Sequence, residues 1–154
     1  METKKNKTTL LIMAAGMGSR FGSLKQLALL GPHKKTLLHY SIYDAVHAGF
    51  DKIVFIIRRS FEDEFKEAVG KYAESLVETV YCFQEMNQLP GNLPPIQREK
   101  PWGTAHAIWT AKDHIHEPFI AINADDFYGR DAFVKMHDFI ADNQDERCLD
   151  RKST

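Results

Sequence analysis

The chain has 154 residues, of which 44% are hydrophobic and 27% charged, as expected of a single globular domain large enough to bury a core. Its formal net charge of -1 gives no global attraction to nucleic acid or to a lipid surface, so we expect neither as a partner. The two cysteines lie far apart without a CxxC pair, and no apolar run approaches the roughly 18 residues of a membrane span, a pattern typical of a cytoplasmic protein.

Short apolar runs alternate with segments of helical periodicity along the chain. Buried strands are predicted at 10–15, 53–57, 77–83 and 118–124. Helices are predicted from apolar spacing at 38–48, 60–72, 103–115 and 131–140. The second helix begins with a capping-box pattern, Ser60 and Asp63, and the third follows Gly103, with Thr104 as its candidate cap.

The segment EMNQLPGNLPPIQREKP, at 85–101, contains four of the six prolines, which forbids a helix and predicts a structured loop, here named the proline loop. Alternation of strands and helices without a hairpin signal predicts right-handed crossovers and a parallel sheet covered on both faces. The predicted fold class is therefore α/β, a Rossmann-like three-layer sandwich with a mostly parallel sheet. We expect one domain over 10–141, with a flexible N-terminus at 1–9 and a polar tail at 142–154.

Unusual polar or flexible residues follow three of the predicted strands. They are Gly16, Gly18 and Arg20 after the first, Gln84 after the third, and Asp125 with Asp126 after the fourth. Open α/β sheets bind their ligands beyond the carboxyl ends of the strands. The pattern therefore predicts a single site at that edge of the sheet.

The stretch LIMAAGMGSRFGSLKQL, at 11–27, has the features of a phosphate-binding turn. Gly16 and Gly18 would let the backbone turn through positive φ and bring N–H groups close to phosphate oxygens. Arg20 and Lys25 would add a bidentate fork and a mobile point charge. The spacing matches neither the dinucleotide GxGxxG pattern nor a P-loop. The alternative is a plain strand-to-helix turn with surface cations.

The other two strand ends carry groups suited to a metal and to a base. Asp125 could hold Mg²⁺ against phosphate oxygens, because Mg²⁺ needs only one or two protein carboxylates, whereas Asp126 could share this role or cap the following turn. Gln84 has the amide donors and acceptor that reading a base edge requires, although it could be an ordinary exposed polar residue. Gly103 permits close approach of the backbone, and His106 could touch a ligand or serve the helix alone.

Together, MAAGMGSRFGSLKQL, YCFQ followed by KPWGTAHA, and NADDFYG resemble, in order and spacing, the nucleotidyltransferase family, which includes the sugar-phosphate nucleotidylyltransferases. The resemblance covers residues 10–140 and implies a fold of the nucleotide-diphospho-sugar transferase type. It also implies transfer of a nucleoside monophosphate from a nucleoside triphosphate to a phosphorylated acceptor such as a sugar phosphate. Pyrophosphate would be released, and Mg²⁺ would be the cofactor.

The resemblance assigns catalytic roles to Arg20 and Lys25 and metal binding to Asp125. It places nucleotide contacts on Ala15, Gly16, Met17, Gly18, Ser19, Arg20, Gln84, Gly103 and Thr104. The chain departs from the family pattern at Leu24, where proline usually precedes the lysine.

Family members also continue past this length with the half that holds the acceptor. A truncated module that binds nucleotide without turnover therefore remains an alternative, as does an NADP-dependent oxidoreductase that uses Arg58 and Arg59. Apolar surface left by a missing half could also pair two copies of the chain into a homo-oligomer.

Overall fold

The computed structural model describes residues 7–16, 29–30, 32–33, 35–91, 93–94, 96–97, 99 and 102–142. Its centre is a parallel sheet of four strands in the order β5-β4-β1-β6. The strands are β1 (Thr9–Met13), β4 (Lys52–Ile57), β5 (Glu78–Phe83) and β6 (Phe119–Asn123). The predicted α/β class and parallel sheet are confirmed, although the first and last strands end one or two residues earlier than expected.

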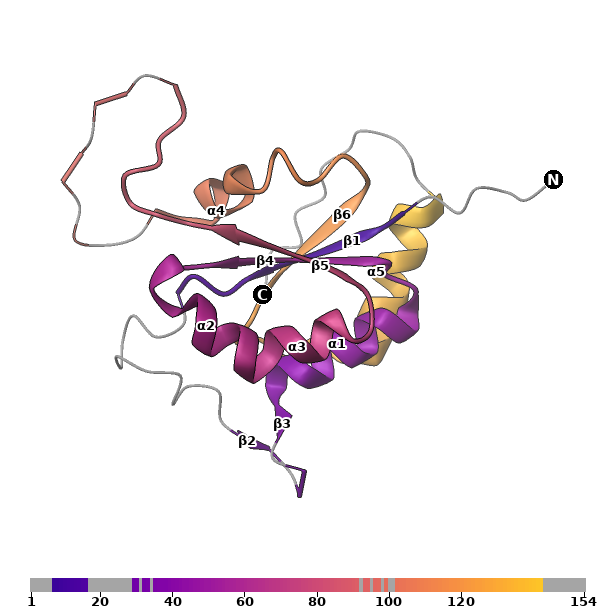
Figure 1. Ribbon diagram of the computed structural model, residues 1–154. Coiled ribbons are helices and arrows are strands. Elements are labelled where there is room, and N and C mark those ends of the chain that lie inside the picture. Colours follow the sequence, from indigo (N-terminus) through magenta and orange to yellow (C-terminus); the bar gives the residue numbers. More distant parts are fainter. Residues whose placement is uncertain are drawn as a thin grey trace.

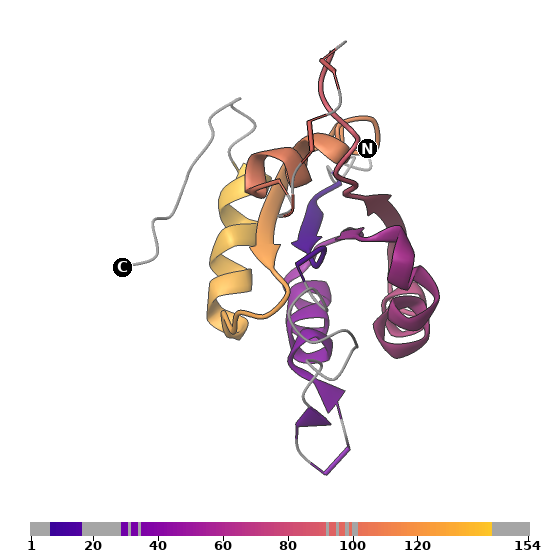
Figure 2. The ribbon, with the colours of Figure 1, turned by 90° about the vertical axis from the view of Figure 1, so that its left-hand side faces the viewer.

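The helices cover the two faces of the sheet unequally (Figures 1 and 2). One face packs against α1 (Leu37–Ala48), α5 (Arg130–Asp142) and the continuous helical segment formed by η2 (Arg59–Phe61), α2 (Glu62–Phe65), η3 (Lys66–Gly70) and α3 (Lys71–Glu74). The other face carries α4 (Thr104–Thr110), which is the single helix there among the described elements. Side chains of β1 alternate accordingly, with Leu10 and Ile12 facing the first layer and Leu11 facing α4.

Two short strands, β2 (Leu29–Leu30) and β3 (Lys35–Thr36), form an antiparallel pair that the sequence analysis did not predict. Strands of two residues are too short to show a period-two pattern. The Gly-Pro dipeptide at 31–32 is a turn signal that could have indicated the pair. The sheet of the domain is therefore accompanied by a hairpin-like element ahead of α1.

Two predicted helix starts are wrong in detail. The helical segment after β4 enters through a 3₁₀ turn at Arg59, so Ser60 lies inside it, and no side-chain cap is present. Likewise Gly103, without a side-chain hydrogen bond, is the N-cap of α4, and Thr104 is its first residue. The capping box forms instead at Thr36, whose hydroxyl accepts from the His39 N–H while the His39 ring accepts from the Thr36 N–H.

The junction of α1 and α5 is tightly packed around Gly49 and His137. Gly49 ends α1 with φ at +116°, and a Cβ at this position would lie 2.8 Å from the His137 ring. The ring is buried and packs edge-on against Phe50, with centroids 5.3 Å apart. Glycine is required here both for the left-handed backbone and for the space that the ring occupies.

We expect Gly49→Ala to lower the free energy of unfolding by about 2–4 kcal/mol, because it adds backbone strain to a steric conflict with His137. Gly91→Ala is the matched control, since Gly91 also has a positive φ of +71° but has no described atom within 4 Å of an added Cβ. Urea unfolding would compare them. An equal loss in the two variants would show that the contact with His137 contributes nothing.

A buried polar cluster joins the amino ends of three strands. Lys52, 8% exposed, donates to Glu117 at 2.9 Å and to the carbonyl of His114, and the Thr9 hydroxyl also donates to Glu117. Burial alone would raise the pKa of the Glu117 carboxyl, but these donors, the His116 N–H and the charge of Lys52 lower it to about 2. The cluster therefore stabilises the fold with Glu117 ionised.

Because the folded pKa of Glu117 is depressed, its contribution is complete above about pH 5 and is lost as pH falls towards 2. We expect Glu117→Gln to remove stability on the order of 2–3 kcal/mol at pH 7 and to flatten the acid limb of the stability profile. Glu78→Gln is the control, since Glu78 pairs with Lys7 at the exposed surface. Parallel acid limbs for Glu117→Gln and the parent would contradict this assignment.

Candidate functional site

The register of the sheet aligns the predicted site residues at one edge. Met13 lies opposite both Ile56 of β4 and Asn123 of β6, and Ile56 lies opposite Cys82 of β5. Two residues beyond these matched positions lie Gln84, Arg58, Ala15 and Asp125, each following the carboxyl end of its own strand. With about 4.8 Å between neighbouring strands, this row extends over roughly 14 Å. The predicted meeting of the strand ends at one edge is confirmed.

The chain order of the strands reverses between β1 and β6. The crossovers from β1 lead to β4 and β5 on one side, and β6 then joins β1 on the other. The pairing continues past the strands, because the Ala124 N–H donates to the Met13 carbonyl at 3.1 Å. Ala15, Gly16 and Asp125 therefore flank the topological switch point, where sheets of this kind bind their ligands.

Part of the predicted triphosphate site lies outside the described residues. This applies to Met17, Gly18, Ser19, Arg20 and Lys25. Their roles as phosphate ligands and catalytic cations stay predictions.

Among the described residues, Gly16 and Gly103 both border open space. A Cβ added at either position would meet no atom of the described residues within 4 Å. Neither glycine has a positive φ, so the expectation that Gly16 turns the backbone through that region is wrong. The described fold does not require glycine at either position, and the absent side chains leave the backbone accessible at this edge.

The two acidic residues after β6 differ in their surroundings. The carboxylate of Asp126 accepts from the Asn123 amide at 2.9 Å and lies 3.4 Å from the Tyr128 hydroxyl, which itself accepts from the Asn123 N–H. Asp125 is exposed, and its carboxylate has no hydrogen bond or ion pair with the described residues. Asp126 thus stabilises the turn after β6. The sequence analysis did not predict that Tyr128 takes part in this turn. Asp125 is the carboxylate that remains for a ligand.

The described ranges contain no group of three or more His, Cys, Asp or Glu side chains that could enclose a metal ion. A protein-only cage is therefore absent from this part of the chain. One free carboxylate is nevertheless compatible with Mg²⁺, which commonly retains water and binds phosphate oxygens in its remaining positions. The Asp125 carboxylate therefore fits Mg²⁺ as one protein ligand among water and phosphate oxygens.

Gln84 is buried at the end of β5, 8% exposed, and its backbone N–H extends the sheet by donating to the Ile57 carbonyl. Its side-chain nitrogen contacts the Trp102 carbonyl at 3.0 Å and the Gly103 carbonyl at 3.3 Å. The amide therefore joins β5 to the start of α4. Gln84 is not the exposed polar residue of the alternative interpretation.

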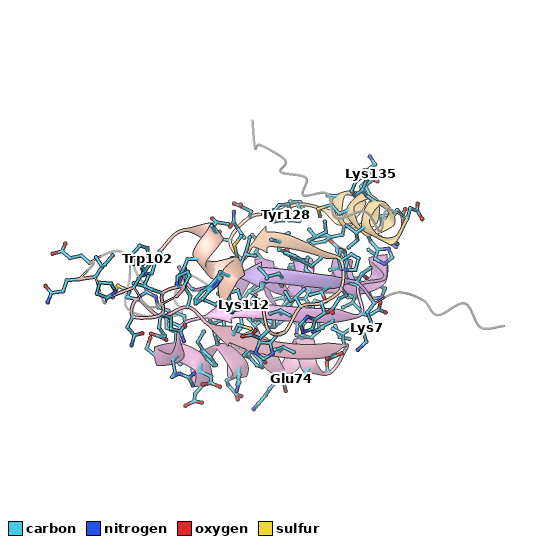
Figure 3. All side chains as sticks on the ribbon, turned by 90° about the horizontal axis from the view of Figure 1, so that it is seen from above. Lys7, Glu74, Trp102, Lys112, Tyr128 and Lys135 are labelled. Atoms are coloured by element: carbon cyan, nitrogen blue, oxygen red, sulfur yellow. The ribbon has the colours of Figure 1, made fainter. Side chains whose placement is uncertain are left out.

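The first part of the proline loop is held against α4 by side chains. The Trp102 indole donates to the Met86 carbonyl at 2.9 Å, and the His106 ring contacts both Gln84 and the carbonyl of Gln88. Figure 3 places Trp102 at the end of the molecule opposite Lys7. Sequence reasoning did not single out Trp102, although it lies within the KPWGTAHA motif.

A small cavity of about 120 Å³ lies beside Gln84. It is lined by Arg58, Ser60, Gln84, Glu85, Met86 and Trp102. Typical ligand pockets measure roughly 300 Å³ or more, so this cavity could hold one ring of a ligand but not a whole nucleotide.

Comparison with known proteins decides the family. The family model described as Nucleotidyl transferase matches residues 9–149, which is most of the chain. The chain belongs to the nucleotidyltransferase family.

No helix in the described ranges is long and apolar enough to cross a membrane.

Individual relatives agree with this membership. The chain is 29% identical over 137 residues to UTP--glucose-1-phosphate uridylyltransferase 1 of Staphylococcus saprophyticus, an alignment that covers 79% of this chain and 46% of that protein. It is 30% identical over 130 residues to the UTP--glucose-1-phosphate uridylyltransferase of Bacillus subtilis, covering 75% and 43%. The chain thus spans less than half the length of these curated relatives.

The fold is shared with solved structures. A UDP-glucose pyrophosphorylase complexed with UDP-glucose superposes with a TM-score of 0.56 at 23% identity, over 86% of this chain and 53% of that one. At this identity the similarity establishes the architecture alone. The predicted nucleotidyltransferase type of fold is confirmed.

Because there is open space beside Gly103, an added methyl group can test ligand binding with little effect on the stability of the fold. We expect Gly103→Ala to change the free energy of unfolding by less than about 1 kcal/mol, since φ at -74° suits alanine whereas the N-cap position of α4 favours glycine. If a ligand approaches this backbone, the added methyl group should weaken nucleoside triphosphate binding severalfold, measurable by calorimetry. Unchanged affinity would place the ligand elsewhere. Gly91→Ala is the control for the affinity measurement alone, because its positive φ of +71° makes alanine strained there.

Proposed function

We propose that the chain carries the nucleotide-binding part of a sugar nucleotidyltransferase. The reaction would transfer a nucleoside monophosphate from a triphosphate to a sugar phosphate. The names of the relatives favour UTP and glucose 1-phosphate as the substrates. The observation that carries the proposal is the alignment of Ala15, Gly16 and Asp125 at the switch point of a sheet whose sequence matches the family.

In this reaction an oxygen of the acceptor phosphate attacks the α-phosphorus of the triphosphate. The bond from the α-phosphorus to the bridging oxygen breaks, and pyrophosphate leaves with the electron pair. No covalent intermediate on the protein is needed. Catalysis would consist of aligning the two substrates and neutralising charge that builds up on the phosphates.

Each residue of the site has a proposed task. Backbone N–H groups of the segment 15–20 would bind the triphosphate, and Arg20 with Lys25 would offset its charge. Asp125 would hold Mg²⁺, which when bound supplies positive charge next to the phosphate oxygens. Gln84 would contact the base, three strands away from Asp125 along the same edge.

A cytoplasmic location and self-association are part of this proposal.

Asp125 and Asp126 offer a matched pair of variants. We expect UTP with Mg²⁺ to raise the stability of the parent by about 2.7 kcal/mol at 100 times Kd. Asp125→Asn should lose the Mg²⁺-dependent part of this shift. Asp126→Asn should lower basal stability, because it weakens the turn with Asn123 and Tyr128, but should keep the Mg²⁺ dependence. A thermal-shift series with and without Mg²⁺ distinguishes them, and a reversed order of effects would contradict the assignment of the metal.

Turnover is tested separately by pyrophosphate release with UTP and candidate sugar 1-phosphates. We expect Lys25→Ala to reduce kcat with a smaller change in KM, since its charge would act mainly on the reacting phosphates. Binding without any release by the parent would favour the module without turnover. Stabilisation by NADP but not by triphosphates would overturn the proposal in favour of an oxidoreductase.

A further inference from the structure

The side-chain amide of Gln84 is oriented by acceptors on three sides of its nitrogen. The Nε2 atom lies 3.0 Å from the Trp102 carbonyl oxygen, 3.3 Å from the Gly103 carbonyl oxygen and 3.1 Å from Nδ1 of His106. Carbonyl oxygens can only accept hydrogen bonds, so the atom that faces them must be the nitrogen. This fixes the direction of an amide whose two ends are otherwise similar in shape.

The tautomer of His106 follows from its other contact. Nε2 of this ring faces the Gln88 carbonyl, which can only accept, so Nε2 carries the proton. In the neutral ring Nδ1 is then an acceptor, and it receives an N–H of Gln84. The ring also contacts Trp102 and Trp109, with centroid distances of 5.9 and 5.5 Å. Gln84, His106 and Gln88 thus form a directed chain of hydrogen bonds.

This arrangement leaves the amide oxygen of Gln84 for a ligand. No donor among the described residues contacts Oε1. The only fully buried side-chain nitrogen or oxygen atoms there without a partner are those of His137, so Oε1 retains access to solvent. Gln84 also lines the 120 Å³ cavity at the carboxyl edge of the sheet. Because its nitrogen is engaged by three acceptors, the group that the side chain has left for a ligand there is an acceptor and not a donor.

We propose that His106 is a positioning residue for nucleotide choice: as the Nε2–H tautomer fixed by Gln88, it holds Gln84 with its amide oxygen towards the base. This inference rests on the proposed function, in which Gln84 contacts the base. An acceptor facing ring position 3 of a pyrimidine matches the N3–H of uracil or thymine. It opposes the lone pair that cytosine carries at the same position. Among pyrimidine nucleotides, this acceptor therefore selects a uridine or thymidine triphosphate.

Rotation of the amide by 180° would reverse this preference. Oε1 would then face two carbonyl oxygens and the lone pair of Nδ1, so all three contacts would become repulsive. The two carbonyls belong to the backbone that leads from the proline loop into α4, whereas Nδ1 comes from a ring fixed by α4 itself. His106 therefore ties the amide to a regular element as well as to a loop.

Two variants of His106 separate positioning from a merely structural contact. The amide oxygen of asparagine can occupy the place of Nδ1 and accept from Gln84 but does not reach Gln88. The amide of glutamine extends to the place of Nε2 and can donate to Gln88 but leaves Gln84 without this acceptor. Affinities for UTP and CTP, with Mg²⁺, are measured by calorimetry for the parent, His106→Asn and His106→Gln.

The parent is expected to bind UTP more tightly than CTP. His106→Gln should reduce the UTP-to-CTP affinity ratio about threefold to tenfold, the effect of one neutral hydrogen bond, and His106→Asn should retain it. An unchanged ratio in His106→Gln, or an equal reduction in both variants, would overturn the role of His106. A parent without preference would overturn the acceptor assignment and leave the proposed function standing, whereas a parent that binds neither nucleotide would remove both.

The tautomer can be checked in the unmodified protein, which keeps the proposal testable if the variants fold poorly. Nitrogen-15 NMR of the histidine rings distinguishes a protonated Nε2 from a protonated Nδ1. We expect the neutral His106 ring to carry its proton on Nε2. A protonated Nδ1 in the neutral ring would place a donor against the Gln84 amide and would sink the inference.

Discussion

The arrangement of the site depends on the pairing of β1 with a neighbour on each side. Met13 is matched with Ile56 and with Asn123, so the ends of three strands are fixed relative to one another by main-chain hydrogen bonds. A shift by one residue in either pairing would turn Asp125 away from the level of Ala15 and invert every side chain of the shifted strand. Leu10 and Ile12 are packed on one covered face of β1 and Leu11 on the other, so the close packing of these side chains opposes such a shift.

Because the strand order is fixed, different chemical groups lie at different positions along the carboxyl edge of the sheet. Groups suited to phosphate and cation lie at the switch point, and the group suited to a base lies at the outer strand β5, where the side chain is oriented by the loop and by α4. The strand ends are rigid because they continue the sheet. The Gln84 side chain is oriented by other side chains and loop carbonyls, so its orientation can vary with little effect on the sheet.

Much of this arrangement is predictable from sequence because it follows from pattern. The apolar runs gave the four parallel strands, and residues immediately after them, such as Gln84 and Asp125, then had to lie at one edge. Features set by tertiary contacts were not predictable. The Ser60 pattern failed because a 3₁₀ turn begins one residue earlier, and Asp126 could be separated from Asp125 only once the contacts to Asn123 and Tyr128 were visible. The hydrogen-bond chain through His106 joins residues that are up to 22 positions apart, a separation that no local motif reveals.

Helix α4 has seven residues and packs against Leu11, Val54 and Ile56 without another described helix on its face. A helix this short has little stability of its own, so its folding depends on that contact. Local opening of α4 would separate His106, Trp102 and Gly103 from Gln84 in one step, and amide exchange in this helix should be faster than in α1. Ligand binding in the 120 Å³ cavity beside Gln84 and the folding of α4 would then be coupled, so a ligand bound there would slow amide exchange throughout α4.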